Sequence, residues 1–222
     1  TAAAHAQGAY PERPIRLVVS QAPGGGTDTI ARLWAEHAGK AIGGTIVVEN
    51  KPGGGGIIAA QNALNQPADG YTLLYGSVSL MVLNRFTYKP LPYDPEKDFT
   101  GVAMLTTVPF VLSTNPATGI KTLKQLTERA KAAPGKLNFA SAGLGNSTHL
   151  AVELLSSTLG ISMTHIPDKG EADGVMATSG GQVEVMSTNV GPTLMQHITS
   201  GKLRPLAVGA PHRLDALPNV PT

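Results

Sequence analysis

Two segments of the chain share one construction, and that construction limits the possible folds more than any other feature. They are IRLVVSQAPGGGTDTIARLWAEHAG (15–39) and LNFASAGLGNSTHLAVELLSSTLG (137–160). Each reads as a short apolar strand, a glycine-broken loop, hydroxyl residues where a helix begins, and a helix that ends in glycine. Strands that alternate with helices of this length are typical of parallel βαβ units in an open sheet. The sequence therefore predicts an α/β fold.

The two helices are expected to pack through equivalent faces. Their apolar residues fall at the same offsets, and this stripe should lie against the sheet of each unit. The predicted packing residues are Ile30, Leu33, Trp34 and Ala38 in the first helix, and Ala151, Leu154, Leu155 and Leu159 in the second.

Further elements are predicted around these two units from apolar periodicity and turn residues. The expected strands are 45–50, 71–77, 101–115 on both sides of Pro109, 182–188 and 203–210, and the expected helices are 57–65 and 123–133, the latter capped by Thr122. The proline-dense segment 88–98 should be an irregular surface stretch. Between 170 and 181, Asp173-Gly174 and Thr178-Ser179-Gly180 interrupt the apolar pattern, so a frayed or short helix is expected there.

The repeated unit also indicates a kind of site. Each helix would aim unpaired N–H groups and roughly half a positive charge at the carboxyl edge of its sheet, where open α/β sheets bind ligands. Glycines allow close backbone approach, and Thr27, Asn146, Ser147 and Thr148 add side-chain hydrogen bonds. The alternative is that the glycines only make tight turns, but two matching loops favour a shared anion site.

Three better-known glycine motifs do not match these loops. A Walker A loop needs lysine after its last glycine, whereas Thr27-Asp28 follows Gly26. A dinucleotide fingerprint needs a third glycine where GLGNST has Thr148. A nucleophile elbow needs glycine where GNSTH has His149. Each of the three motifs therefore lacks at least one required residue in this sequence.

Composition excludes several function classes. The 41% of hydrophobic and 14% of charged residues indicate a globular chain, and 17 basic against 15 acidic residues leave too little charge for a nucleic-acid surface. Cysteine is absent, which excludes disulfides and thiolate metal sites, and the histidines have no metal-ligand spacing. Ala4-His5-Ala6 before Gln7 has the form of a signal-peptidase site, so an exported protein is expected; an arbitrary alanine-rich end is the alternative. No apolar run is long enough to span a membrane.

Ordered motifs along the chain carry a specific resemblance. They are YPERPIRLVVSQAPGGGTDTIARLWAE, VVENKPGGGGIIAAQNALNQPADGYTLLYGS, LPYDPEKDF, KAAPGKLNFASAGLGNSTHLAVELL, and HIPDKG followed by GGQV. From about residue 10 to 222 the chain resembles the extracytoplasmic solute receptors of tripartite tricarboxylate transporters, the Bug-type family. The resemblance implies a type II periplasmic-binding-protein fold, in which two α/β domains on a two-strand hinge close over a ligand like a Venus flytrap.

The resemblance also implies a function, a location and partners. Such a receptor is periplasmic, binds a small organic carboxylate (a di- or tricarboxylate, an aromatic acid or an amino acid), and delivers it to membrane permease subunits without cofactor, metal or catalysis. The implied domains are 10–108 and 109–206, after a leader remnant at 1–9 and before a return towards the first domain at 207–222.

The implied ligand contacts come from loops in both domains, with Gly25, Gly26 and Thr27 nearest the ligand in the first. The full predicted set is Gln21, Ala22, Gly24, Gly25, Gly26, Thr27, Asp28, Ser77, Ser141, Ala142, Gly143, Gly145, Asn146, Ser147, Thr148, His149 and Asp168. Ser20, Gln21 and Asp168 depart from the apolar or aromatic residues usual in the family, which predicts a more polar pocket. Asp168 is hypothesised to meet a ligand hydroxyl, amine or protonated carboxyl; a solvated loop aspartate is the alternative.

Two departures keep other functions open. Relatives continue for several tens of residues after LPNVPT, so either part of the protein is absent from this sequence or something else completes the first domain. A first domain without its returning segment would expose apolar core, which predicts partner pairing or marginal stability. The irregular 170–181 stretch could weaken a pocket wall. The alternatives to a carboxylate receptor are a small α/β enzyme acting on a carboxylated substrate, and a receptor-derived sensing or scaffold protein without ligand transport.

Overall fold

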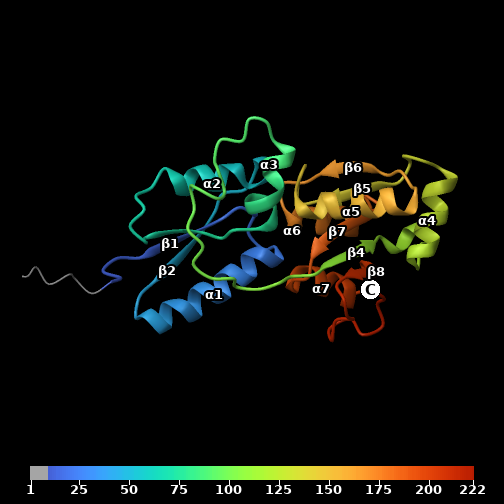
Figure 1. Cartoon of the computed structure of the whole chain (residues 1–222). Helices are drawn as coiled ribbons and strands as arrows, with labels where there is room; N and C mark the ends of the chain where they lie inside the picture. The colour runs from blue at the N-terminus through green and yellow to red at the C-terminus, as the bar shows by residue number, and fades with distance from the viewer. Residues whose placement is uncertain (1–9) are drawn as a thin grey trace, which may run out of the picture.

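The computed structural model of the chain describes residues 10–222, which form two lobes that each contain their own sheet (Figure 1). The expected leader remnant, residues 1–9, lies outside the described residues. Within 10–222 the chain crosses between the lobes once, through a segment ending at Pro109 that has neither helix nor strand. None of the helices in this part of the chain combines the length and apolar character that crossing a membrane requires.

The first lobe has a parallel sheet in the order β2-β1-β3. Its elements are β1 (Ile15–Val19), α1 (Gly26–Ile42), β2 (Ile46–Asn50), η1 (Gly54–Gly56), α2 (Ile57–Leu64), β3 (Thr72–Leu74), η2 (Ser79–Leu83) and α3 (Asn84–Thr87). Apart from Arg16, the central strand β1 is apolar and buried on both faces, as expected where helices cover a parallel sheet on both sides. Leu17 and Val19 pack with α1, and a separate cluster holds Ala60 of α2 with Leu80 of η2.

The second lobe has a mixed sheet in the order β6-β5-β7-β4-β8. Its elements are β4 (Phe110–Thr114), η3 (Pro116–Thr118), α4 (Leu123–Ala132), β5 (Asn138–Ser141), α5 (Ser147–Leu159), β6 (Thr164–Pro167), α6 (Glu171–Ser179), β7 (Val185–Asn189), α7 (Pro192–Thr199) and β8 (Arg204–Gly209). Strands β5, β6 and β7 are parallel, and β4 runs antiparallel to both β7 and β8.

Alternating side chains of this sheet enter two separate cores. Val111 and Met186 pack with α6 and α7 on one face, whereas Leu112 and Val185 pack with α4 and α5 on the other. The second lobe is therefore a three-layer α/β/α unit, and its two faces position the helix tips that matter for the site.

Thr122 caps α4 and Gly160 ends α5 as predicted, but α1 continues through its predicted end at Gly39 to Ile42. The Thr122 hydroxyl accepts the Gln125 N–H at 3.2 Å at the start of α4, and the Asn146 side chain accepts from the Thr148 N–H at the start of α5. Helices α1 and α5 both end in glycine with φ near 60°, at Gly43 and Gly160, where a left-handed residue closes the last turn.

The packing faces of α1 and α5 differ from the prediction. Leu33 and Leu154 are 56% and 70% exposed, whereas small side chains at spacing i, i+4, i+8 face the sheet. The buried positions are Ala31, Ala35 and Gly39 in α1 and Thr148, Val152 and Ser156 in α5. Small residues bring the helix axis close to the strands, so the larger residues flank the contact instead of forming it.

Other expectations also need correction. Residues 101–108 form no strand, so the predicted two-strand hinge is absent from residues 10–222. The segment 207–222 does not turn back to the first lobe: β8 pairs with β4, and Leu217 and Val220 complete the core beside α6 and α7. The 170–181 stretch does contain a short helix as expected, the nine-residue α6, whereas β6, α7 and the η2–α3 segment were not predicted.

The corrected packing face of α5 can be tested by a pair of leucine truncations. Leu126 is fully buried on α4, so Leu126→Ala should lower the free energy of unfolding by about 2–5 kcal/mol. Leu154→Ala removes a mostly exposed side chain and should change it by less than about 0.5 kcal/mol. Urea unfolding of both variants measures these free energies. An equal loss of stability for Leu154→Ala and Leu126→Ala would mean that Leu154 packs against the sheet, as first predicted.

Candidate functional site

The first glycine loop ends in a helix tip that no side chain of its own segment caps. Gly25 is the N-cap residue of α1 and is extended, so the first N–H groups of the helix have no local partner. The buried Asp28 carboxylate instead braces the loop, accepting from Gly24 N–H at 3.0 Å, Asn50 Nδ2 at 2.8 Å and Arg32 Nε at 3.0 Å. Burial alone would raise the pKa of Asp28, but these hydrogen bonds together lower it.

The partner of this tip comes from the other lobe. The Gly26 N–H donates to Glu171 Oε2 at 2.9 Å, and the Thr27 hydroxyl donates to Oε1 at 3.2 Å. The Thr27 N–H lies 3.5 Å from Oε2, and Asn189 Nδ2 donates to Oε1 from the end of β7. Glu171 is only 4% exposed, and burial raises its pKa against the effect of these donors. We call this set of donors, from Gly26, Thr27 and Asn189, the α1 seat.

The second glycine loop is capped from within and from the first lobe. Thr148 Oγ1 accepts the Ala142 N–H at 3.0 Å, and Asn146 Oδ1 accepts the Thr148 N–H at 3.1 Å. The Ser147 N–H donates across the lobe junction to Ser79 Oγ at 2.9 Å. The tip of α5 therefore differs from that of α1: neutral side chains already pair its amide groups.

A stacked pair of histidines supports this second loop. The His149 and His165 rings lie 3.9 Å apart, and the His149 Nδ1 accepts the Gly145 N–H at 3.2 Å. Ser141 Oγ and His165 Nε2 are 2.7 Å apart. Burial lowers the pKa of His149; burial and then the neighbouring His149 lower that of His165 to about 4. Both rings are therefore neutral near pH 7, which leaves the His149 Nδ1 free to accept.

The two lobes meet at very short range beside the α1 seat. A Cβ added to Gly191 would lie 2.6 Å from the Gly26 Cα, so only a glycine fits at this contact. Thr193 Oγ1 donates to the Gly24 carbonyl at 2.6 Å, and Tyr88 OH donates to the Leu144 carbonyl at 3.0 Å farther along the junction. The lobes are therefore closed on one another in this structure.

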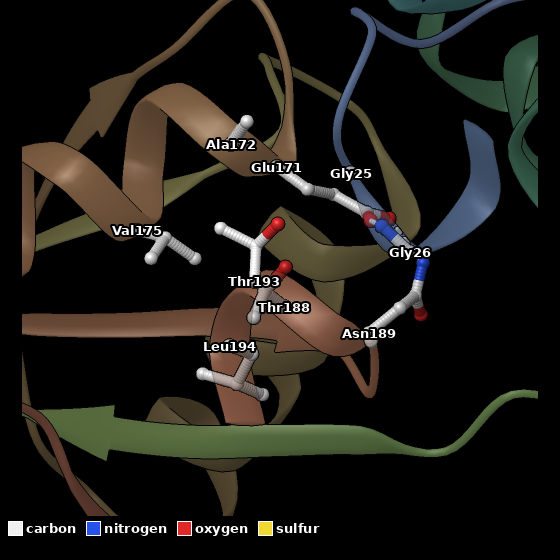
Figure 2. A pocket seen from close by; sticks show the side chains of 10 residues that line it. Gly25, Gly26, Glu171, Ala172, Val175, Thr188, Asn189, Thr193 and Leu194 are labelled. Atoms are coloured by element: carbon white, nitrogen blue, oxygen red, sulfur yellow. Dashed lines mark hydrogen bonds between the residues drawn. The ribbon is translucent and has the colours of Figure 1, made fainter. Parts of the chain in front are cut away.

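A small cavity lies at the junction (Figure 2). It has a volume of about 10 Å³, which is room for a single water. Its lining comes from the first loop and from α6, β7 and α7, and consists of Gly25, Gly26, Glu171, Ala172, Val175, Thr188, Asn189, Gly191, Thr193 and Leu194. Gly25 and Gly26 are thus the only predicted residues in its lining, and residues 141–149 are not part of it.

The remaining predicted residues lie around the junction in various structural roles. The Gln21 carbonyl accepts from Asn50, Ala22 packs against Gly170, and Ser77 Oγ accepts the Leu80 N–H. Gly143 and Gly145 have positive φ and shape the second loop. The structure brings both loops to the lobe junction, but it pairs the two helix tips with different partners instead of placing them in one shared cavity.

Asp168 lies at the turn between β6 and α6. Its Oδ2 is buried against Gly174 and has no hydrogen-bond partner among the described residues. Burial, and then the nearby Asp173 carboxylate, raise its pKa to about 6. One of its two carboxylate oxygens is therefore shielded from solvent, and this free acceptor fits the hypothesis that a ligand donor meets it.

Sequence reasoning missed the residues that complete the α1 seat. Glu171 stands 145 positions from Gly26, and in the sequence it looks like an ordinary acidic residue in the first turn of a helix. Asn189, Thr193 and Ser79 also contact the opposite lobe or its partners, and no local pattern marks them. Only the packing of the two lobes brings these side chains to the glycine loops.

Two lobes that contact each other through helix tips, each with a separate α/β sheet, define a two-lobed binding-protein architecture. The family model of the tripartite tricarboxylate transporter receptor matches residues 30–222. The chain therefore belongs to this receptor family, and the resemblance drawn from its motifs is confirmed.

Curated relatives support the same assignment. The chain is 39% identical over 214 residues to a protein encoded in the tcbD-tcbE intergenic region of Pseudomonas sp. strain P51, covering 96% of the chain and 63% of the relative. It is 38% identical over 214 residues to protein BugT of Bordetella pertussis, covering 96% and 65%. The chain thus spans slightly less than two thirds of the length of these relatives.

Solved structures confirm the fold. A periplasmic transporter superposes with a TM-score of 0.93 at 40% identity, covering 96% of this chain and 71% of that one. Rpa4515 of R. palustris with adipate gives 0.92 at 34% identity with the same coverage. MatC of Rhodopseudomonas palustris with bound malate gives 0.89 at 32% identity, covering 96% and 72%. The predicted α/β periplasmic-binding-protein fold is therefore confirmed.

The close contact between Gly26 and Gly191 predicts that one methyl group will separate the lobes. Gly191→Ala should disfavour the closed form by about 1–3 kcal/mol, because its Cβ meets backbone atoms that cannot rotate away. Small-angle X-ray scattering should then show a larger radius of gyration. Gly101→Ala, at a position with no atoms within 4 Å, is the matched control. An unchanged radius for Gly191→Ala would mean that the lobes do not close in solution.

The half-buried Asp168 predicts that replacing it by asparagine will raise the free energy of unfolding in a pH-dependent way. Because its folded-state pKa is about 6 and its ordinary value 3.8, ionisation removes stability as pH rises through this range. Asp168→Asn should match the parent near pH 4 and exceed it near pH 7.5 by about 1 kcal/mol, after reduction for partial solvent screening.

The comparison must use the difference between variant and parent, since His165 titrates in the same range with the opposite sign. Its lowered pKa of about 4 means that stability falls as pH drops from 6.5. Chemical unfolding at several pH values gives the difference directly. A difference between Asp168→Asn and parent that does not change with pH would show that folding does not shift the pKa of Asp168.

Proposed function

We propose that this protein is a periplasmic receptor that captures a small organic carboxylate and delivers it to the membrane permease of a tripartite transporter. It would act by binding and release, without chemical conversion of the ligand. The proposed contacts are the two glycine loops, with the remaining predicted residues around them.

The observation that carries the proposal is the nature of the α1 seat. In this chain a carboxylate, that of Glu171, lies on the tip of α1 and is bonded by amide and hydroxyl donors. A helix tip with such neutral donors suits reversible binding of an anion, because it supplies hydrogen bonds without the strong pairing of a guanidinium. Related structures described with adipate and with malate support a carboxylate as the ligand class.

The enzyme alternative has one observation in its favour, the 2.7 Å contact between Ser141 Oγ and His165 Nε2. Ser141 is only 2% exposed, and the His165 ring stacks against those of Phe139 and His149 and pairs with no carboxylate among residues 10–222. A nucleophile needs an accessible oxygen and an oriented base, so this pair favours a structural role. Ligand recovered unchanged after incubation would support binding alone.

The proposal predicts stabilisation by acids and not by their neutral analogues. A carboxylate at 100 times its dissociation constant should raise the free energy of unfolding by about 2.7 kcal/mol. Adipate, malate, citrate, benzoate and glutamate should be compared in a thermal-shift screen with adipamide and malamide, and hits confirmed by isothermal titration calorimetry.

A matched pair of serine variants tests the second loop. Ser147→Ala at the tip of α5 should weaken a confirmed acid by about 3–10-fold, the loss expected for one hydrogen bond, whereas Ser157→Ala on the exposed face of the same helix should have no effect. Equal stabilisation by acids and diamides, or consumption of the acid, would contradict the proposal. If no acid stabilises the protein, a sensing or scaffold role is favoured.

A further inference from the structure

The α1 seat already holds a carboxylate of the protein itself. Both oxygens of Glu171 are bonded, Oε2 by the Gly26 N–H and Oε1 by the Thr27 hydroxyl and the Asn189 amide. The glutamate is the first residue of α6 and belongs to the second lobe, whereas the helix tip belongs to the first. The contact therefore links the lobes through the same chemistry that a bound acid would use.

The charge of Glu171 has no cationic partner among the residues that line the cavity. Apart from Glu171, these residues are glycines, aliphatic side chains, two threonines and an asparagine. An ionised carboxylate that is 96% buried depends on donors in place of a counterion, and the tip of the 17-residue α1 supplies them. The seat thus holds the carboxylate through neutral hydrogen-bond donors alone.

A second observation at the same place points to a polar occupant. Thr188 is 2% exposed, lines the cavity, and its hydroxyl has no hydrogen-bond partner among the described residues. Figure 2 shows the hydroxyl oxygens of Thr188 and Thr193 on the side of the cavity where the Glu171 carboxylate lies. A buried hydroxyl without a partner is costly, so the cavity is built to contact polar atoms beyond those present.

Glu171 and an external carboxylate cannot share the seat while the lobes are closed. A Cβ on Gly25 would lie 3.2 Å from Glu171 Oε2, and a Cβ on Gly26 would lie 2.9 Å from the Val190 carbonyl. The adjoining cavity has room for one water and is too small for a second carboxylate with its carbon chain. An acid from solution must therefore displace Glu171 before it reaches the α1 seat.

From these contacts we propose that Glu171 is a resident carboxylate that competes with the ligand for the α1 seat and holds the empty receptor closed. This inference takes the identity of the competing ligand from the proposed function, whereas the seat itself follows from the contacts alone. Because the glutamate is tethered, it competes at a high effective concentration and lowers the apparent affinity for external acids. Glu171 would thereby set the minimum intrinsic affinity for the seat that a carboxylate ligand needs in order to displace it.

Removing the side chain should leave a place that a small free acid fills. Glu171→Ala deletes a methylene and a carboxylate, and acetate replaces these atoms closely. Acetate should raise the melting temperature of Glu171→Ala in a saturable way, by about 2–4 °C, and leave the parent unchanged. Sodium chloride at equal ionic strength and acetamide at equal concentration are the controls for salt and for the neutral group.

Two further variants keep this test decisive. Asp173→Ala removes another acidic residue from the first turn of α6, outside the cavity lining, and should not respond to acetate. Glu171→Gln keeps the shape of the side chain and should also not respond, because the seat stays filled. If acetate stabilises none of the variants, or stabilises all of them and the parent equally, the seat is not selective and the inference is wrong.

The closure and the competition are measured separately. Scattering of the ligand-free proteins should give a larger radius of gyration for Glu171→Ala than for the parent or Asp173→Ala; equal radii would overturn the role of Glu171 in closure. Adipate and malate should bind Glu171→Ala at least 10-fold more tightly than the parent. If both proteins bind these acids with equal, measurable affinity, Glu171 does not compete with the ligand, but the proposed function stands. If Glu171→Ala responds to acetate and neither protein binds a larger acid, the seat is supported and the proposed function is contradicted.

Discussion

The hydrogen bonds between the tip of α1 and the carboxylate of Glu171 are the interaction on which the arrangement of the two lobes depends. Each group would be unfavourable alone: the tip lacks a side-chain cap within its own segment, and the carboxylate is buried with no cation among the described residues that line the cavity. Together they pair the orphan N–H groups and stabilise the charge. The glycines at 26 and 191 make this possible, because any larger residue would hold the lobes apart.

The two helix tips have similar sequences but different surroundings, and the difference gives them different roles. The tip of α5 is paired by Asn146 within its own loop and by Ser79 across the junction, so its donors are already satisfied by neutral groups. The tip of α1 has no such cap and takes a charged partner instead. A ligand at α5 would exchange with hydroxyl and amide groups, whereas a ligand at α1 must replace a carboxylate.

Much of the fold could be predicted from the sequence, since local patterns determine it. Strand β1, the cap Thr122 and the glycine that ends α5 lie where expected, whereas α1 runs past the expected Gly39 to Ile42. The packing faces were wrong at Leu33 and Leu154, because small residues at spacing i, i+4, i+8 allow close approach to the sheet and a hydrophobicity pattern gives them little weight.

The candidate site was only half predictable. Both glycine loops were identified, but the partner of the first, Glu171, is 145 residues away and looks locally like any acidic residue at a helix start. A contact of this kind depends on how two lobes pack, and no single segment encodes it. The same holds for Thr188 and Asn189, whose position beside the tip follows from the register of β7 in the sheet.

The most direct measurement of the central claim is an NMR titration of the seat. Glu171 should ionise with a midpoint above the ordinary 4.5, because burial raises its pKa. The amide proton shifts of Gly26 and Thr27 should then move with the same midpoint as the Glu171 carboxyl carbon. Amide shifts that stay constant while Glu171 titrates near 4.5 would show that the carboxylate is not held at the tip of α1.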